Sequence, residues 1–176
     1  MPPLPIPDRV YPHVCAIDPA DLRRQGITLL LADLDNTLAK YGQQDPDPAV
    51  LAWKNQLQAA GITLFLLSNS RKPVRVAHYA AALDIPFLGH AGKPRSKGFL
   101  AAMAERQVGP QQTAMVGDQI FTDMLGAKCA GVKALLVEPI ALSGNPGRYL
   151  RYAVETPFRA AGNYKTRQAL AKGRVK

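Results

Sequence analysis

Two aspartates separated by one residue, Asp33 and Asp35, are the side chains of this sequence best placed to do chemistry. They follow an apolar run over residues 27–32, whose length is typical of a buried strand. In open parallel sheets, ligands bind at the carboxyl ends of the strands. Two unpaired carboxylates there are electrostatically costly, and a bound cation would offset that cost. The pair therefore indicates a divalent-metal site with a carboxylate nucleophile; the alternative is that Asp35, Asn36 or Thr37 caps a following helix.

Polar side chains also follow three later apolar runs of the chain. Ser68 and Asn69 come directly after the second run, Lys93 lies in the loop after the third, and Asp118 follows the fourth, with Asp123 five residues on. Acids, a hydroxyl and a lysine are the groups that phosphoryl transfer needs: carboxylates hold Mg²⁺, one carboxylate can act as nucleophile, and donors stabilise the phosphoryl charge. Taken singly, Ser68 could be a strand-end cap and Lys93 a surface lysine.

The elements that must position these side chains are predicted by hydrophobic patterning. Five short apolar runs read as strands, and segments with helical spacing separate them. This alternation predicts an α/β fold with a mostly parallel five-stranded sheet, right-handed crossovers and helices on both faces. The predicted strands are residues 27–32, 62–67, 85–88, 113–116 and 134–137, and the helices are 19–25, 49–60, 73–83, 97–107 and 122–130.

The polar stretches at the strand ends resemble, in order, the four motifs of the haloacid dehalogenase-like (HAD) superfamily. These stretches are Asp33-Leu34-Asp35-Asn36-Thr37, Ser68, Lys93 and Gly117-Asp118 through Asp123. The resemblance implies a Rossmann-like core and a Mg²⁺-dependent phosphatase that forms an aspartyl-phosphate. Asp33 would be the nucleophile and a metal ligand. Asp35 would be the general acid and base and would bind the metal through its backbone carbonyl, and Thr37 would orient Asp35.

The same resemblance implies roles for the remaining motif residues. Ser68, Asn69 and Lys93 would bind the substrate, with Ser68 on the phosphoryl group and Lys93 pairing with both the nucleophile and the phosphate. Asp118 would ligate Mg²⁺, and Asp123 would support the metal from behind the coordinating ligands or through water. P-type ATPases resemble this family but carry threonine two residues after the nucleophile, so the acid at that position here argues for a phosphatase.

No cap domain is expected, because the two gaps where family members carry one are short. Residues 38–48 hold only a loop, and residues 70–92 hold one helix and one strand. An open site sequesters a small metabolite poorly, which favours a large substrate or closure by a partner. Arg71, Lys72 and Arg75 either face an anionic substrate or form a solvated helix start. The expected organisation is a lead-in with a short helix over 1–26, the phosphatase core over 27–140, and a basic C-terminal segment over 141–176, packed on the core or trailing from it.

A closer resemblance, over residues 10–140, is to the YqeG family of HAD phosphatases. Eukaryotic relatives of that family are phosphatidylglycerophosphate phosphatases, so the resemblance implies phosphatidylglycerophosphate or a similarly large anionic substrate, a membrane lipid head group among them. The shared positions are Tyr11-Pro12, Ile17, Leu22, Gly26-Ile27, residues 33–38, Ser68-Asn69, Ile85-Pro86-Phe87, Ala91-Gly92-Lys93-Pro94, Gly117-Asp118-Gln119 and Thr122-Asp123.

Charge is concentrated at the C-terminal end of a chain whose formal net charge is +9. Residues 148–176 hold eight basic side chains against one acid, Glu155, which favours an anionic partner. Tyrosine, leucine and valine are interspersed, so residues 147–161 form either an interfacial helix that contacts acidic lipid or an ordinary amphipathic helix packed on the sheet. A solvated tail that aids solubility is the third interpretation.

Three functions therefore compete at this point: a phosphatase for a phospholipid head group, a HAD phosphatase for a soluble sugar or nucleotide phosphate, and an RNA- or ribosome-binding protein with a vestigial site. The intact acid and lysine set argues against the last, and the tail lacks a nucleic-acid motif, so no specific nucleic acid is expected. With no signal-peptide pattern and no apolar run long enough to span a bilayer, the expected location is the cytoplasm, with peripheral contact at the inner face of the membrane.

Overall fold

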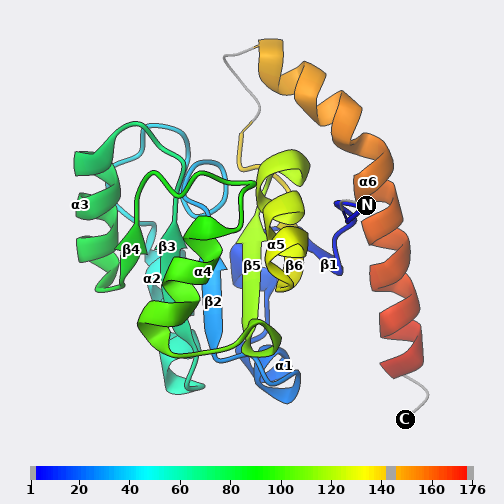
Figure 1. The fold of residues 1–176 in the computed structure, drawn as a ribbon, viewed down its shortest axis with the longest axis horizontal. Helices are drawn as coiled ribbons and strands as arrows, with labels where there is room; N and C mark the ends of the chain where they lie inside the picture. The colour runs from blue at the N-terminus through cyan, green and yellow to red at the C-terminus, as the bar shows by residue number, and fades with distance from the viewer. Residues whose placement is uncertain (1–2, 142–145, 174–176) are drawn as a thin grey trace.

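A six-stranded sheet forms the centre of the protein, whose computed structural model describes residues 3–141 and 146–173 (Figure 1). Every strand pair in the described sheet is parallel, and the strand order is β1-β6-β5-β2-β3-β4. The strands are β1 (Arg9–Tyr11), β2 (Leu29–Ala32), β3 (Thr63–Leu67), β4 (Phe87–Leu88), β5 (Thr113–Gly117) and β6 (Lys133–Val137). The parallel α/β fold expected from the sequence is confirmed.

The sixth strand is the difference from the sequence prediction, which gave five. All five predicted strands form, but β1 joins them from the segment expected to be an extended lead-in, with Val10 in register with Leu136 of β6. Its three residues are only half-buried because β1 lies at the edge of the sheet. A strand this short and this weakly buried gives no apolar run, so hydrophobic patterning does not reveal it.

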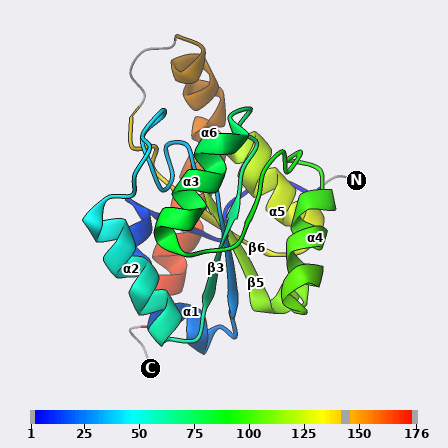
Figure 2. The same ribbon diagram turned by 90° about the vertical axis from the view of Figure 1, so that its left-hand side faces the viewer.

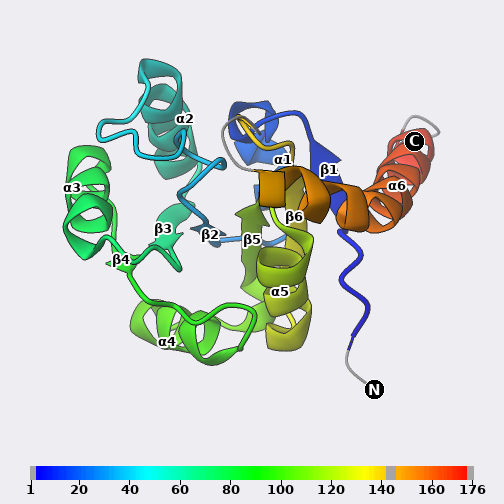
Figure 3. The ribbon, with the colours of Figure 1, turned by 90° about the horizontal axis from the view of Figure 1, so that it is seen from above.

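Two layers of helices cover the sheet, as the view from above makes plain (Figure 3). Successive side chains of β2 point to opposite faces of the sheet, so Leu30 and Ala32 pack in one hydrophobic core and Leu29 and Leu31 in the other. The first core takes side chains from α1 (Pro19–Arg24), α2 (Pro48–Ala59) and α3 (Pro73–Leu83). The second takes them from α4 (Lys97–Arg106) and α5 (Leu125–Ala130), which follows a π-helical turn, η3 (Ile120–Met124).

A long helix, α6 (Pro146–Gly173), closes the β1 edge of the sheet. It begins above the carboxyl ends of the strands and descends past β1 (Figures 1 and 2). The backbone amide of Val10 donates a hydrogen bond of 2.9 Å to the Thr166 hydroxyl, and Gly162 lies against Pro7 and Val10. Of the basic residues counted in the sequence, Arg174, Lys176 and the side chain of Arg148 lie outside the described part. Among the helices in the described ranges, none has the length and apolar character needed to cross a bilayer.

Candidate active site

The acidic site lies where the strand order reverses. The chain moves from β2 outward to β3 and β4, then crosses back to β5 on the other side of β2, so β2 and β5 are neighbours at a topological switch point. Asp33 follows β2 and Asp118 follows β5, and the Asp33 amide donates to the Val116 carbonyl at 3.0 Å. Asp33, Asp118 and Asp123 are all buried, and each offers a carboxylate oxygen within 4.8 Å of the others.

Asp123 reaches the cluster because the chain after β5 forms the π-helical turn η3 rather than entering an α-helix directly. One Asp123 oxygen accepts a hydrogen bond of 3.2 Å from the backbone amide of Gln119. The same carboxylate lies against the α-carbon of Gly117, where any β-carbon would overlap it. The sequence prediction began a regular helix at Thr122; the turn that replaces its start brings Asp123 beneath the strand end, in line with the frequent occurrence of such turns at functional sites.

Lys93 bridges two of the three carboxylates. Its ammonium nitrogen lies 2.7 Å from an Asp33 oxygen and 2.7 Å from an Asp123 oxygen, and only 1% of the side chain is exposed. Asn69 fixes the Lys93 backbone from both sides: its amide nitrogen donates to the Lys93 carbonyl and its oxygen accepts from the Lys93 amide, both at 2.9 Å. Burial alone would lower the pKa of Lys93, but the adjacent Asp123 and Asp33 carboxylates raise it overall. The lysine is therefore an internal cation.

One lysine does not neutralise three buried carboxylates. Burial, reinforced by Asp33 and Asp123, raises the pKa of Asp118 well above its usual range. Burial also raises the pKa of Asp123 to about 6, with Lys93 opposing the shift. Clustered carboxylates that resist ionisation fit a bound divalent cation, whose charge would relieve the repulsion. An all-oxygen donor set suits a hard cation such as Mg²⁺.

Asp35 lies apart from the three-carboxylate cluster and has a partner of its own. Its carboxylate accepts from the Arg75 guanidinium at 2.7 Å, and Arg75 also donates to the Gln43 carbonyl at 2.9 Å and the Lys40 carbonyl at 3.3 Å. Arg75 is 5% exposed. The sequence left open whether Arg75 faces an anionic substrate or belongs to a solvated helix start; it instead holds Asp35 and the loop that follows β2.

Two hydroxyl groups predicted to act at the site are buried beside it. Ser68 lines the site, and its oxygen accepts from the Ser70 amide at 3.0 Å. The Thr37 hydroxyl donates a long hydrogen bond of 3.4 Å to an Asp118 oxygen, so Thr37 contacts the loop after β5 (residues 118–120), called the metal-site loop below. Its predicted role, the orientation of Asp35, stays a prediction.

These groups open onto a pocket of about 240 Å³. No cap domain is inserted in the described chain: residues 33–47 form a loop, and α3 alone separates β3 from β4. Lys93 and Asp123 are buried beside the pocket and are not among the residues that line it. The side chains on the wall are Asp33, Asp35, Asn36, Tyr41, Ser68, Asn69, Ser70, Asp118, Gln119 and Pro139, together with Arg151, Tyr152, Glu155 and Arg159 of α6.

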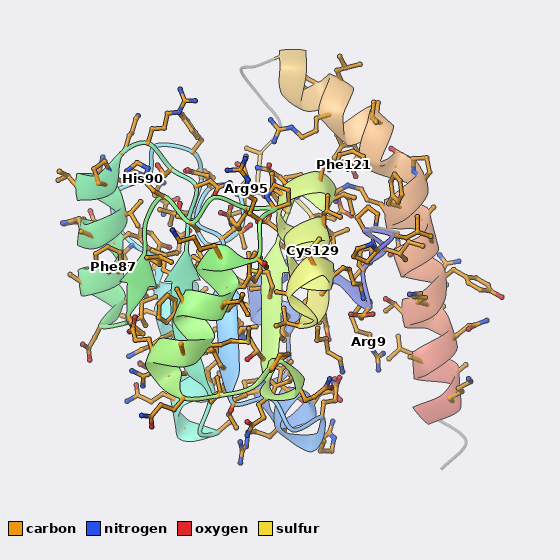
Figure 4. All side chains as sticks on the ribbon, in the orientation of Figure 1. Arg9, Phe87, His90, Arg95, Phe121 and Cys129 are labelled. Atoms are coloured by element: carbon orange, nitrogen blue, oxygen red, sulfur yellow. The ribbon has the colours of Figure 1, made fainter. Side chains whose placement is uncertain are left out.

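The α6 side of the wall is tied directly to the metal-site loop. The Glu155 carboxylate accepts from the Ile120 amide at 3.0 Å, and Arg159 donates to the Asp118 carbonyl and pairs with Glu155 at 3.1 Å. Phe121, labelled in Figure 4, stands between α5 and α6 and meets Phe158 edge to face at 5.5 Å. The helix is therefore packed on the core between Tyr152 and Thr166.

Sequence reasoning missed the contribution of α6 to the site. The available signal was Glu155, the one acid in a basic stretch, with Arg159 four residues on and hence on the same helix face. That spacing predicts a pair within the helix. It does not predict that both side chains also bind the backbone at residues 118–120.

Comparison with known proteins agrees with this geometry. Residues 15–131 match the family model of haloacid dehalogenase-like hydrolases. The chain is 30% identical over 138 residues to the probable phosphatase YqeG of Bacillus subtilis, covering 78% of this chain and 80% of that protein. It is 30% identical over 151 residues to the chloroplastic phosphatidylglycerophosphate phosphatase 1 of Chlamydomonas reinhardtii, covering 81% of this chain but 56% of that one. The chain therefore belongs to the haloacid dehalogenase-like hydrolases.

A solved structure with the same fold is the cobalt-bound deoxy-D-mannose-octulosonate 8-phosphate phosphatase of Haemophilus influenzae. It superposes with a TM-score of 0.51 at 18% identity, over 86% of this chain and 98% of that chain. The family and the relatives together make this protein a phosphatase that acts on a phosphorylated substrate. The predicted membership, fold and enzyme class are confirmed.

Proposed function

We propose that the protein hydrolyses phosphomonoesters with Mg²⁺ through an aspartyl-phosphate on Asp33. The observation that carries the proposal is the cluster of Asp33, Asp118 and Asp123 around Lys93, with Asp35 beside it on the pocket wall. Asp33 and Asp118, with Asp123 in support and the Asp35 backbone carbonyl, would hold the cation. When bound, it would neutralise charge on the carboxylates and on the phosphoryl oxygens.

The proposed reaction has two displacements at phosphorus. An Asp33 carboxylate oxygen attacks the phosphorus, the bond to the leaving-group oxygen breaks, and protonated Asp35 gives its proton to that oxygen. Water then attacks the phosphorus, Asp35 takes a proton from it, and the bond to Asp33 breaks to release phosphate. Arg75 would position the Asp35 side chain at the wall, since the two groups are 2.7 Å apart in the structure.

The phosphoryl oxygens would be bound by the Ser68 hydroxyl and the Lys93 ammonium group. Both are fixed in advance: Ser68 by the Ser70 amide, and Lys93 by the two-way hydrogen bonds of Asn69. Preorganised donors of this kind stabilise developing charge without reorganisation at the moment of reaction. Asn69 would contribute to substrate binding partly by positioning Lys93.

For the substrate we propose phosphatidylglycerophosphate or a similarly large anionic phosphomonoester. The pocket is open and lacks a cap, which suits a bulky leaving group. The Chlamydomonas relative carries a name that specifies this lipid. The first turns of α6, beside the pocket, expose Tyr149, Leu150 and Val154 next to Arg151, which suits contact with an anionic membrane surface. The proposal includes a cytoplasmic location with peripheral contact at the membrane.

The test is phosphate release from phosphatidylglycerophosphate in mixed micelles, with Mg²⁺ or with chelator, for the wild type and Asp33→Asn. Turnover that requires Mg²⁺ and disappears in the variant is the expected result. Hydrolysis of phenyl phosphate without lipid turnover would keep the mechanism and favour a soluble sugar or nucleotide phosphate. Failure on both, with salt-sensitive binding to RNA, would favour the binding protein with a vestigial site.

A further inference from the structure

Most charged side chains on the pocket wall have a partner in the fold. Asp33 pairs with Lys93 and Asp35 with Arg75, each at 2.7 Å. Arg151 differs, because in the described part of the chain it is the one cation on the wall that no carboxylate accompanies. An exposed arginine on the wall of a pocket proposed to bind phosphate esters, with no carboxylate partner among the described residues, is a candidate ligand-binding group.

The second cation on the wall, Arg159, cannot serve the same purpose. Its guanidinium donates to the Asp118 carbonyl and pairs with Glu155 at 3.1 Å and Glu138 at 3.4 Å, and its side chain is buried. The Tyr152 ring lies over that guanidinium at 4.4 Å, and the Tyr152 hydroxyl donates to Glu138 at 2.9 Å. Arg159 is thus committed to holding α6 on the core.

Helix geometry places Arg151 at the outer part of the pocket. Arg151 and Glu155 are four residues apart, so they share a face of α6, and Glu155 points into the core to accept from the Ile120 amide at 3.0 Å. Arg151 lies about 6 Å nearer the start of the helix along its axis. It is therefore about one turn further from the metal-site loop than Glu155.

We infer that Arg151 forms a subsite for a second anionic group, carried by the alcohol portion of the substrate. The substrate class is a phosphomonoester whose leaving alcohol bears a phosphate, phosphodiester or carboxylate. The planar guanidinium binds such groups through two parallel hydrogen bonds. The inference rests on the proposed function, because the first phosphate must occupy the Asp33 end of the pocket.

Matched substrates test the subsite. Glycerol 1,3-bisphosphate and glycerol 3-phosphate differ only in the second phosphate, short-chain phosphatidylglycerophosphate supplies a lipid head group, and phenyl phosphate reports the basal reaction. The variants are Arg151→Gln, Arg151→Lys and Arg167→Gln, the last a control that removes an exposed arginine further along the same helix. We expect Arg151→Gln to raise KM about tenfold for at least one doubly anionic substrate, with kcat unchanged. Its kcat/KM for phenyl phosphate should stay within about twofold of the wild-type value.

Other outcomes separate this inference from the proposed function. Arg151→Lys is expected to recover part of the affinity and Arg167→Gln to change nothing. A bisphosphate effect would identify a soluble source of the anion, and an effect on the lipid alone would identify the head group. The subsite alone would be overturned if Arg151→Gln lost kcat/KM equally on phenyl phosphate. It would also be overturned if the wild type did not prefer either doubly anionic substrate to glycerol 3-phosphate. A wild type inactive on phenyl phosphate and on every other substrate would overturn the proposed function itself.

Discussion

Replacement of Lys93 by methionine is expected to destabilise the metal-free protein strongly. The side chain is fully buried and its ammonium nitrogen is 2.7 Å from a carboxylate oxygen of both Asp33 and Asp123. Methionine fills a similar volume but leaves the buried carboxylates of Asp33 and Asp123 without the cation that pairs with them. Removing one member of a buried ion pair costs about 3–5 kcal/mol. For a chain of this length, that lowers Tm by roughly 6–20 °C.

The assay is urea unfolding in chelator and again in excess Mg²⁺, with Lys165→Met as the control for loss of an exposed lysine. We expect the control to change the free energy of unfolding by less than about 0.5 kcal/mol. Mg²⁺ should stabilise the Lys93 variant more than the wild type, because the cation then takes over the missing positive charge. Activity should be lost in both conditions, since the phosphoryl group loses its donor.

A double substitution sharpens this test. Adding Asp123→Asn to Lys93→Met removes one of the stranded carboxylates, so the double variant should be more stable in chelator than the single variant. If Lys93→Met costs no more than the control, or if Asp123→Asn makes it less stable still, the account of Lys93 as the internal counter-ion is wrong. The comparison is made in chelator because bound metal would mask the repulsion.

Two further predictions concern Asp35, which pairs with Arg75, and Asp123, which pairs with Lys93. Arg75→Gln should lower kcat at least tenfold with little change in KM, because Asp35 loses its buried partner while the phosphate-binding groups remain. Arg75→Lys should recover part of kcat. An unchanged kcat of Arg75→Gln in steady-state assays would contradict this reasoning. Burial raises the pKa of Asp123 to about 6, so the folded metal-free protein keeps a proton that the unfolded chain releases near pH 4. The contribution of this group to the free energy of unfolding is therefore lost as the pH rises through about 6. Since metal binding competes with that proton, the Mg²⁺-induced rise in Tm should be larger at pH 7.5 than at pH 5, and equal shifts in thermal denaturation would count against a metal held by this cluster.

The residues that sequence reasoning located correctly share one property. Asp33 and Ser68 come directly after an apolar run and Asp118 follows one after a single glycine, so identifying the strands was enough to bring them to one edge of the sheet. Lys93 and Asp123 lie further from a strand; the pattern placed them in the loops after the third and fourth runs, and the resemblance to the family supplied their roles.

The contacts that were not predicted depend on packing rather than on position along the chain. Arg75 reaches Asp35 across 40 residues because α3 packs with its first turn beside the loop after β2. Arg159 reaches the Asp118 carbonyl across 41 residues because α6 docks at the edge of the sheet. Periodicity shows which face of a helix is apolar but not which element that face will meet. The strand β1, which receives α6, was itself hidden by its short, half-buried sequence.

The docking of α6 on β1 connects a segment near the N-terminus with the C-terminal helix. The Val10 amide bonds Thr166, Gly162 seats against Pro7, and eleven residues before Gly162 the same helix presents Arg151 to the pocket. A fusion partner or deletion that displaced residues 7–11 would therefore loosen a wall of the pocket from a point outside it. The acids follow the central strands β2 and β5, so such a change would reach them only through the contacts that Glu155 and Arg159 make with residues 118–120.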